Sequence, residues 1–134
     1  LVQRSRTQLF TNAIPPHSAA GALAAIEHLE SHPEMVTRLR ENAEYFRAGL
    51  KELGYQPIEG DTPIIPVIIG ETADAIALST RLLDEGVFVI GFGFPVVPHG
   101  TARIRSQISA AHTREHLDRA LEALDRSGRE LGLL

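Results

Sequence analysis

The sequence has no cysteine and no tryptophan among its 134 residues, and its only lysine is Lys51. Without cysteine, the chain has no disulfide, no thiolate nucleophile and no cysteine-ligated metal. No apolar run approaches the roughly 20 residues that a membrane-spanning helix requires. A formal net charge of -4 supplies no basic surface for nucleic acid or anionic lipid. We therefore expect neither nucleic acid nor a membrane as a partner.

An initiator methionine is also missing, because the chain begins at Leu1 and its single methionine is Met35. We interpret the chain as the C-terminal part of a longer protein. No basic and apolar leader precedes the domain, so we expect a cytoplasmic location. The content of 43% hydrophobic and 22% charged residues is ordinary for a globular domain, and 134 residues suffice for one core.

Two helices are predicted in the first half of the chain. A proline pair leads into an alanine-rich helix over residues 16–30. Ser31 is the expected N-cap of the next helix, with Glu34 three residues later. Apolar residues at steps of three and four then continue the second helix until Gly54 ends it.

Two further helices are predicted in the second half. The third covers residues 72–85, and its apolar side consists of Ile76, Ala77, Thr80 and Leu83. The fourth covers residues 113–131, with Thr113 as its N-cap. Its inward-facing leucines are Leu117, Leu121, Leu124 and Leu131.

The strands lie between these helices. Residues 64–69 form an apolar run of strand length, in which Pro66 indicates an edge position or a bulge. Residues 87–90 are predicted as a buried strand, residues 102–109 as an alternating one, and residues 55–60 as a short edge strand. The predicted fold is α+β, with a three- to four-stranded, mainly antiparallel sheet covered by helices.

Residues 91–113, GFGFPVVPHGTARIRSQISAAHT, carry the chemistry of the chain. Arg103 and Arg105 are two apart on a strand, so their side chains share one face, while Ile104 and Ile108 point toward the core. A guanidinium on the open face of a sheet can hold a small carboxylate with two parallel hydrogen bonds. The alternative is a surface strand whose arginines pair with acidic neighbours.

The pattern PVVP-x-G-x-ARIR-x-Q-x-SAAHT closely resembles the C-terminal end of the α-oxoamine synthases, pyridoxal-phosphate enzymes of the aspartate aminotransferase fold type I. Within that family it is most similar to the glycine C-acetyltransferases, or 2-amino-3-ketobutyrate CoA ligases, and the similarity covers nearly the whole chain. The resemblance implies that residues 1–15 are an interdomain and active-site segment. It also implies that residues 16–134 are the small C-terminal domain, preceded by a long interdomain helix, with the large cofactor domain absent from this chain.

The resemblance further implies that the parent protein is a pyridoxal-phosphate-dependent homodimer that condenses glycine with acetyl-CoA to 2-amino-3-ketobutyrate and CoA. Arg105 matches the family arginine that grips the α-carboxylate of the amino acid. Thr11 matches the serine or threonine whose hydroxyl reaches the cofactor phosphate of the neighbouring subunit. For Arg103 the family suggests no role, and we expect a structural ion pair.

Lys51 does not match the Schiff-base lysine of the family, because no serine or threonine with flanking glycines surrounds it. It lies next to Glu52 near the end of a predicted helix, where a surface role is expected. We expect the Schiff-base lysine in the absent large domain, so this chain alone should be inactive.

Val96 bears on the branch of the family. In the 5-aminolevulinate and 8-amino-7-oxononanoate synthases the position between the two prolines is commonly threonine. An apolar Val96 beside Phe94 suits a short acetyl group, although Phe92 and Phe94 equally fit plain loop packing. The alternatives are another α-oxoamine synthase, of the 8-amino-7-oxononanoate or 5-aminolevulinate type, and a non-catalytic stand-alone dimerisation module.

The histidines do not indicate a metal site. His28 and His32 are four residues apart, but Pro33 follows and no third ligand is signalled. His112 and His116 share this spacing, but the start of the last predicted helix falls between them. We expect His112 to pack or to cap a helix. His99 lies in a turn where members of the family often carry a lysine.

Overall fold

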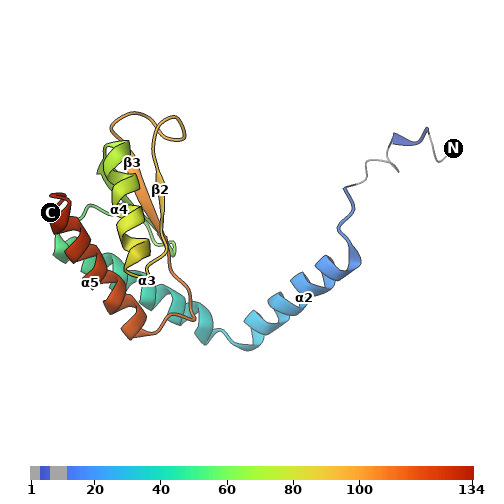
Figure 1. Cartoon of the computed structure of the whole chain (residues 1–134). Coiled ribbons are helices and arrows are strands. Elements are labelled where there is room, and N and C mark those ends of the chain that lie inside the picture. The colour runs from blue at the N-terminus through green and yellow to red at the C-terminus, as the bar shows by residue number, and fades with distance from the viewer. Residues whose placement is uncertain (1–3, 7–11) are drawn as a thin grey trace. The chain divides into compact units, whose positions relative to one another are not determined.

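The computed structural model describes residues 4–6 and 12–134 (Figure 1). The chain divides into two compact units, Leu1–Glu34 and Met35–Leu134. The predicted domain boundary after residue 15 stays a prediction. None of the helices in the described ranges is both long and apolar enough to cross a membrane.

In the first unit, helix α2 (Pro16–Ser31) confirms the predicted helix over residues 16–30. The first backbone N–H of a helix has no acceptor within the helix, so a proline at this position loses no hydrogen bond. Taken by itself, α2 has no buried residue. Ser31 is the last residue of α2, and its hydroxyl donates to the Glu27 carbonyl. The prediction of Ser31 as N-cap of the next helix was therefore wrong.

The second unit is a three-stranded sheet packed against helices. Both strand pairs are antiparallel and the strand order is β1-β3-β2. This confirms the predicted α+β class. The elements in chain order are α3 (Glu34–Leu53), β1 (Ile64–Gly70), α4 (Thr72–Asp84), β2 (Ile90–Phe92), β3 (Ala102–Gln107) and α5 (Arg114–Glu130).

Pro66 lies in the edge strand β1, as predicted, and its register partner on β3 is Arg105. A residue of a strand directs its N–H and C=O groups to the same side. The Pro66 carbonyl accepts from the Ile58 N–H at 2.8 Å, so the missing proline donor faces the outer side, away from β3. The predicted strand over residues 55–60 is reduced to one bridge between Pro57 and Val67.

One face of the sheet is covered by helices, and α4 contacts all three strands. Apolar side chains from α3, α4, α5, β1 and β3 meet there, and each fully buried leucine or isoleucine contributes about 1.5–3 kcal/mol of hydrophobic burial. The large apolar side chains with the least exposure are Leu50, Ile65, Val67, Leu78, Leu82, Ile104, Leu117 and Leu124.

Helix α4 is apolar on two sides, and the packed side is not the predicted one. Ala75, Leu78 and Leu82 are fully buried. Ile76 and Leu83, which the sequence placed on the apolar side, are 53% and 57% exposed. The side of α4 that packs against the sheet is therefore the one that contains Ala75, Leu78 and Leu82.

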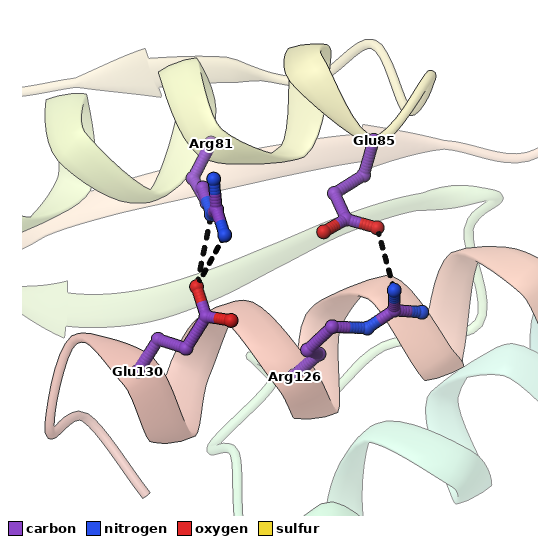
Figure 2. Close-up of polar contacts among 4 residues, drawn as sticks. All are labelled: Arg81, Glu85, Arg126 and Glu130. Carbon is purple, nitrogen blue, oxygen red and sulfur yellow. Dashed lines mark hydrogen bonds and ion pairs between the residues drawn. The ribbon is translucent and has the colours of Figure 1, made fainter.

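Two ion pairs link α5 to α4 and to Glu85, the residue that caps the C-terminal end of α4, as Figure 2 shows. Arg81 Nη2 lies 2.6 Å from Glu130 Oε2, and Arg126 Nη1 lies 3.2 Å from Glu85 Oε2. Arg81, Arg126 and Glu130 are about half exposed in their side chains, so solvent screens both pairs and each contributes little to stability. The buried leucines beneath contribute more to the packing of these helices.

The predicted buried strand over residues 87–90 begins only at Ile90. Gly86, at φ +81°, ends α4, and the Val87 N–H donates back to the Leu82 carbonyl at 2.8 Å. This 6→1 bond belongs to a Schellman motif and keeps Val87 out of the sheet. Phe88 is 75% exposed, which corrects the prediction of burial.

Helix α5 begins as predicted with Thr113 as N-cap. The Thr113 hydroxyl accepts from the His116 N–H at 3.3 Å, and His116 Nδ1 accepts in return from the Thr113 N–H at 3.3 Å. Together these bonds form a capping box in which a histidine replaces the usual glutamate. Of the four leucines predicted to face inward, Leu117 and Leu124 are buried, Leu121 is half-buried and Leu131 is 40% exposed.

Candidate functional site

Strand β3 alternates between the buried and the open face of the sheet. Ala102, Ile104 and Ser106 are buried, whereas Arg103 is half-buried and Arg105 is exposed. The two arginines therefore share the open face, as their spacing predicted.

Arg105 has no carboxylate within ion-pair distance among the residues that the structure describes. Its guanidinium carbon instead lies 4.7 Å from the centroid of the Phe92 ring, a cation–π distance. A guanidinium keeps its N–H groups in its own plane, so a contact of its carbon with a ring leaves N–H groups available for a planar acceptor. The alternative of an arginine paired with an acidic neighbour does not describe Arg105.

Arg105 also lines a surface groove of about 570 Å³ beside β2 and the first turns of α5. The groove contains a second guanidinium, Arg119, and one carboxylate, Glu85, which is already paired with Arg126. It therefore combines an excess of positive charge with an apolar floor. The floor includes Phe46, Val89, Ile108 and Leu117.

The glycines around Phe92 let β2 approach α4 closely. A Cβ atom at Gly91 would lie 2.8 Å from the Ala75 carbonyl oxygen, and one at Gly93 would lie 2.2 Å from Thr72 Cγ2. The Phe94 N–H also donates to Thr72 Oγ1 at 3.2 Å. These glycines thus serve close packing, and Phe92 is held between two anchored neighbours.

The loop after β2 holds the remaining candidates. Phe94 stacks on His99 with ring centroids 3.9 Å apart, and Val96 is 72% exposed. The Arg103 Nε–H donates to the Thr101 carbonyl at 3.1 Å. The structural ion pair predicted for Arg103 is not found in the described part of the chain.

His112 has a structural role, as predicted. Its Nδ1 accepts from the Ser109 N–H at 3.2 Å, and its carbonyl accepts from the Asn42 side-chain amide at 2.9 Å. Within residues 4–6 and 12–134, no three histidine or carboxylate side chains come together as metal ligands.

Lys51 does not offer a free amine. Its Nζ lies 2.7 Å from Glu59 Oε1, and this bond lowers the pKa of the Glu59 carboxyl. The side chain of Lys51 is 49% exposed on α3, which agrees with the surface role expected from the sequence. Thr11, the predicted contact to a cofactor phosphate, lies outside the described residues.

Sequence reasoning missed the contact of Phe92 with Arg105, because plain loop packing was the one alternative it offered for Phe92. The strand register pairs Phe92 with Arg103, which makes Arg105 its diagonal neighbour on the same face. Diagonal neighbours are within reach of aromatic and long side chains. Only the register of β2 against β3 would have revealed the contact.

The family model "Aminotransferase class I and II" matches residues 1–124. The chain therefore belongs to the class I and II aminotransferase family. Over all 134 of its residues it is 50% identical to an 8-amino-7-oxononanoate synthase of Symbiobacterium thermophilum. It is 47% identical, again over 134 residues, to an 8-amino-7-oxononanoate synthase/2-amino-3-ketobutyrate coenzyme A ligase of Thermus thermophilus.

A solved structure, that of the serine palmitoyltransferase from Sphingomonas wittichii, superposes on 99% of the chain with a TM-score of 0.87 at 29% identity. The names of the two curated relatives are among the activities that the sequence analysis weighed for the parent protein. The chain spans 34% of the length of both curated relatives and 34% of the solved structure.

Proposed function

We propose that this chain is the C-terminal part of a pyridoxal-phosphate-dependent acyltransferase in which Arg105 binds the carboxylate of the amino-acid substrate. The observation that carries the proposal is the exposed guanidinium, which lies over the Phe92 ring and has no acidic partner among the described residues. An arginine fork in this state matches a carboxylate with two parallel hydrogen bonds. Membership of the family supports an amino-acid substrate.

Within this proposal, Arg105 fixes the orientation of the amino acid rather than performing the chemistry. Holding a substrate in one orientation lowers the barrier because less motion has to be frozen in the transition state. The cofactor and its lysine would come from the rest of the parent protein, because Lys51 is paired with Glu59. Thr11 would reach the cofactor phosphate of the partner subunit in a homodimer.

For the substrates, we propose glycine and acetyl-CoA, with 2-amino-3-ketobutyrate and CoA as products. The Thermus thermophilus relative, whose name includes 2-amino-3-ketobutyrate coenzyme A ligase, supports this branch. The Symbiobacterium thermophilum relative supports 8-amino-7-oxononanoate synthesis equally well. Val96 is largely exposed, so the described residues do not enclose it in an acyl pocket. Turnover of the full-length parent with acetyl-, succinyl- and pimeloyl-CoA separates the branches.

The role of Arg105 is tested with Arg105→Ala in the full-length parent protein. Losing hydrogen bonds between charged partners costs about 1.5–3 kcal/mol, so we expect the KM for glycine to rise about 10- to 150-fold. The absorbance of the bound cofactor should stay in place. Isothermal titration calorimetry with glycine alone checks that the change lies in binding.

Arg103→Ala is the matched control, because it removes a guanidinium from the same strand face. Arg103 donates to a backbone carbonyl two residues away, so its loss should leave the glycine KM within about twofold of wild type, a difference of about 0.4 kcal/mol. An unchanged glycine KM in Arg105→Ala, or an equal rise in both variants, would contradict the proposal.

A further inference from the structure

The aromatic contact of Arg105 suggests a second residue that acts on the same substrate. We propose that Phe92 is a positioning residue, whose ring holds the Arg105 guanidinium flat and directs its N–H edge at the amino-acid carboxylate. This inference rests on the carboxylate-binding role proposed for Arg105. Phe92 does not touch the substrate in this proposal, and it acts only through the guanidinium.

The register of the sheet places the two side chains together. Phe92 pairs with Arg103 and Ile90 pairs with Arg105, so all four side chains lie on the open face of the sheet. The ring and the guanidinium are then diagonal neighbours, 4.7 Å apart from centroid to Cζ. Figure 1 shows β2 and β3 side by side, and α4 packs against both strands.

The ring itself is held by the backbone on both sides. Gly91 and Gly93 turn their hydrogen atoms toward α4, where any Cβ would meet Ala75 or Thr72 at less than 3 Å. Because side chains alternate along a strand, Phe92 between them must face the opposite way, toward Arg105. The close approach of β2 to α4 therefore fixes the Cα–Cβ bond of Phe92 toward the face that Arg105 occupies.

A long arginine side chain loses rotamer entropy when it is fixed in one conformation. If a partner already restricts the guanidinium in the free protein, less rotamer entropy is lost when the substrate binds. An acidic partner would restrict it as well, but it would also occupy the N–H groups that the substrate needs. An aromatic ring restricts the face of the guanidinium and leaves its edges free.

The test uses the full-length parent with Phe92→Leu, which removes the ring and keeps an apolar side chain. An exposed cation–π contact corresponds to about a two- to fivefold change in an equilibrium constant, so we expect glycine binding to weaken by about that factor. The KM for acyl-CoA and the kcat should stay close to those of the unmodified protein. Calorimetry with glycine alone measures the binding constant independently of turnover.

Two variants separate positioning from a general effect on folding. Phe92→Tyr retains the ring and should bind glycine as the unmodified protein does. Phe94→Leu is the matched control, because Phe94 stacks on His99 and makes no contact with Arg105 in the described structure. It should leave glycine binding unchanged.

A double-mutant cycle links the effect to the guanidinium. In an Arg105→Ala background, Phe92→Leu should cause no further loss of glycine binding. Unchanged glycine binding in Phe92→Leu, or an equal loss in both backgrounds, would overturn the inference while leaving the role of Arg105 standing. An Arg105→Ala variant that binds glycine normally would instead overturn the proposed function, and the inference with it.

Discussion

Replacing Gly91 by alanine should destabilise the second unit, because the new methyl group would meet the backbone of α4. The Cβ would lie 2.8 Å from the Ala75 carbonyl oxygen, about 0.6 Å short of the 3.4 Å at which ordinary contact begins. The carbonyl belongs to a helix and cannot rotate away, so β2 or α4 has to move. Overpacking of this kind costs about 1–3 kcal/mol.

Part of that cost is offset, because alanine lowers the conformational entropy of the unfolded chain by about 0.4–1 kcal/mol. The expected net loss for Gly91→Ala is therefore about 1–2 kcal/mol in the free energy of unfolding. Urea denaturation of the chain followed by far-ultraviolet circular dichroism measures this value, provided that the slope against urea is unchanged.

Gly49→Ala is an informative comparison, because its Cβ would be even closer to a neighbour, 2.5 Å from Leu121 Cδ1. That neighbour is the tip of a half-buried side chain, which can change rotamer at about 0.5–1.5 kcal/mol. Alanine also favours the interior of α3 by about 0.5–1 kcal/mol over glycine. We expect Gly49→Ala to be neutral within about 1 kcal/mol. A greater loss in Gly49→Ala than in Gly91→Ala would refute the reasoning that rigid backbone contacts dominate.

Two further predictions concern stability. Tyr55 is 6% exposed and donates to the Leu124 carbonyl at 2.9 Å, and burial, with a smaller effect from Asp125, raises its pKa from 10.0 to about 12. Between those values the unfolded chain has lost the proton and the folded chain retains it, so stability falls as pH rises above 10. Tyr55→Phe should lower the free energy of unfolding by about 1 kcal/mol at pH 8. The difference from the unmodified protein should shrink at pH 11, because only the unmodified protein loses stability through Tyr55. A difference that does not change with pH would contradict this prediction. Thr113→Ala should lower the free energy of unfolding by about 1 kcal/mol, because α5 loses its N-cap hydrogen bond. Thr113→Ser keeps the hydroxyl and should retain most of this stability, which thermal unfolding of both variants would show.

Local rules predicted most elements well, because their signals are short-range. The N-cap of α5 needs only Thr113 and the first turn that follows, and the edge position of Pro66 needs only its missing N–H. The shared face of Arg103 and Arg105 follows from the alternation of a strand. Each of these features depends on residues within a few positions of one another.

Two of the errors occurred where the local pattern allowed two arrangements of apolar residues. Helix α4 could bury Ala75, Leu78 and Leu82 or the side that includes Ile76 and Leu83, and only contact with the sheet decided between them. Residues 87–90 have the apolar composition of a buried strand, but the Schellman motif at Gly86 keeps Val87 out of the sheet.

The amino-acid sequence by itself determined the α+β class, the family and the arginine that faces outward. Composition, periodicity and a long motif are properties of neighbouring residues, and they survive without coordinates. Only the tertiary structure decided that Phe92 lies against Arg105 and that no acidic side chain among the described residues pairs with that guanidinium. Those facts depend on the register between β2 and β3 and on the close approach of β2 to α4, which residues far apart in the chain establish together.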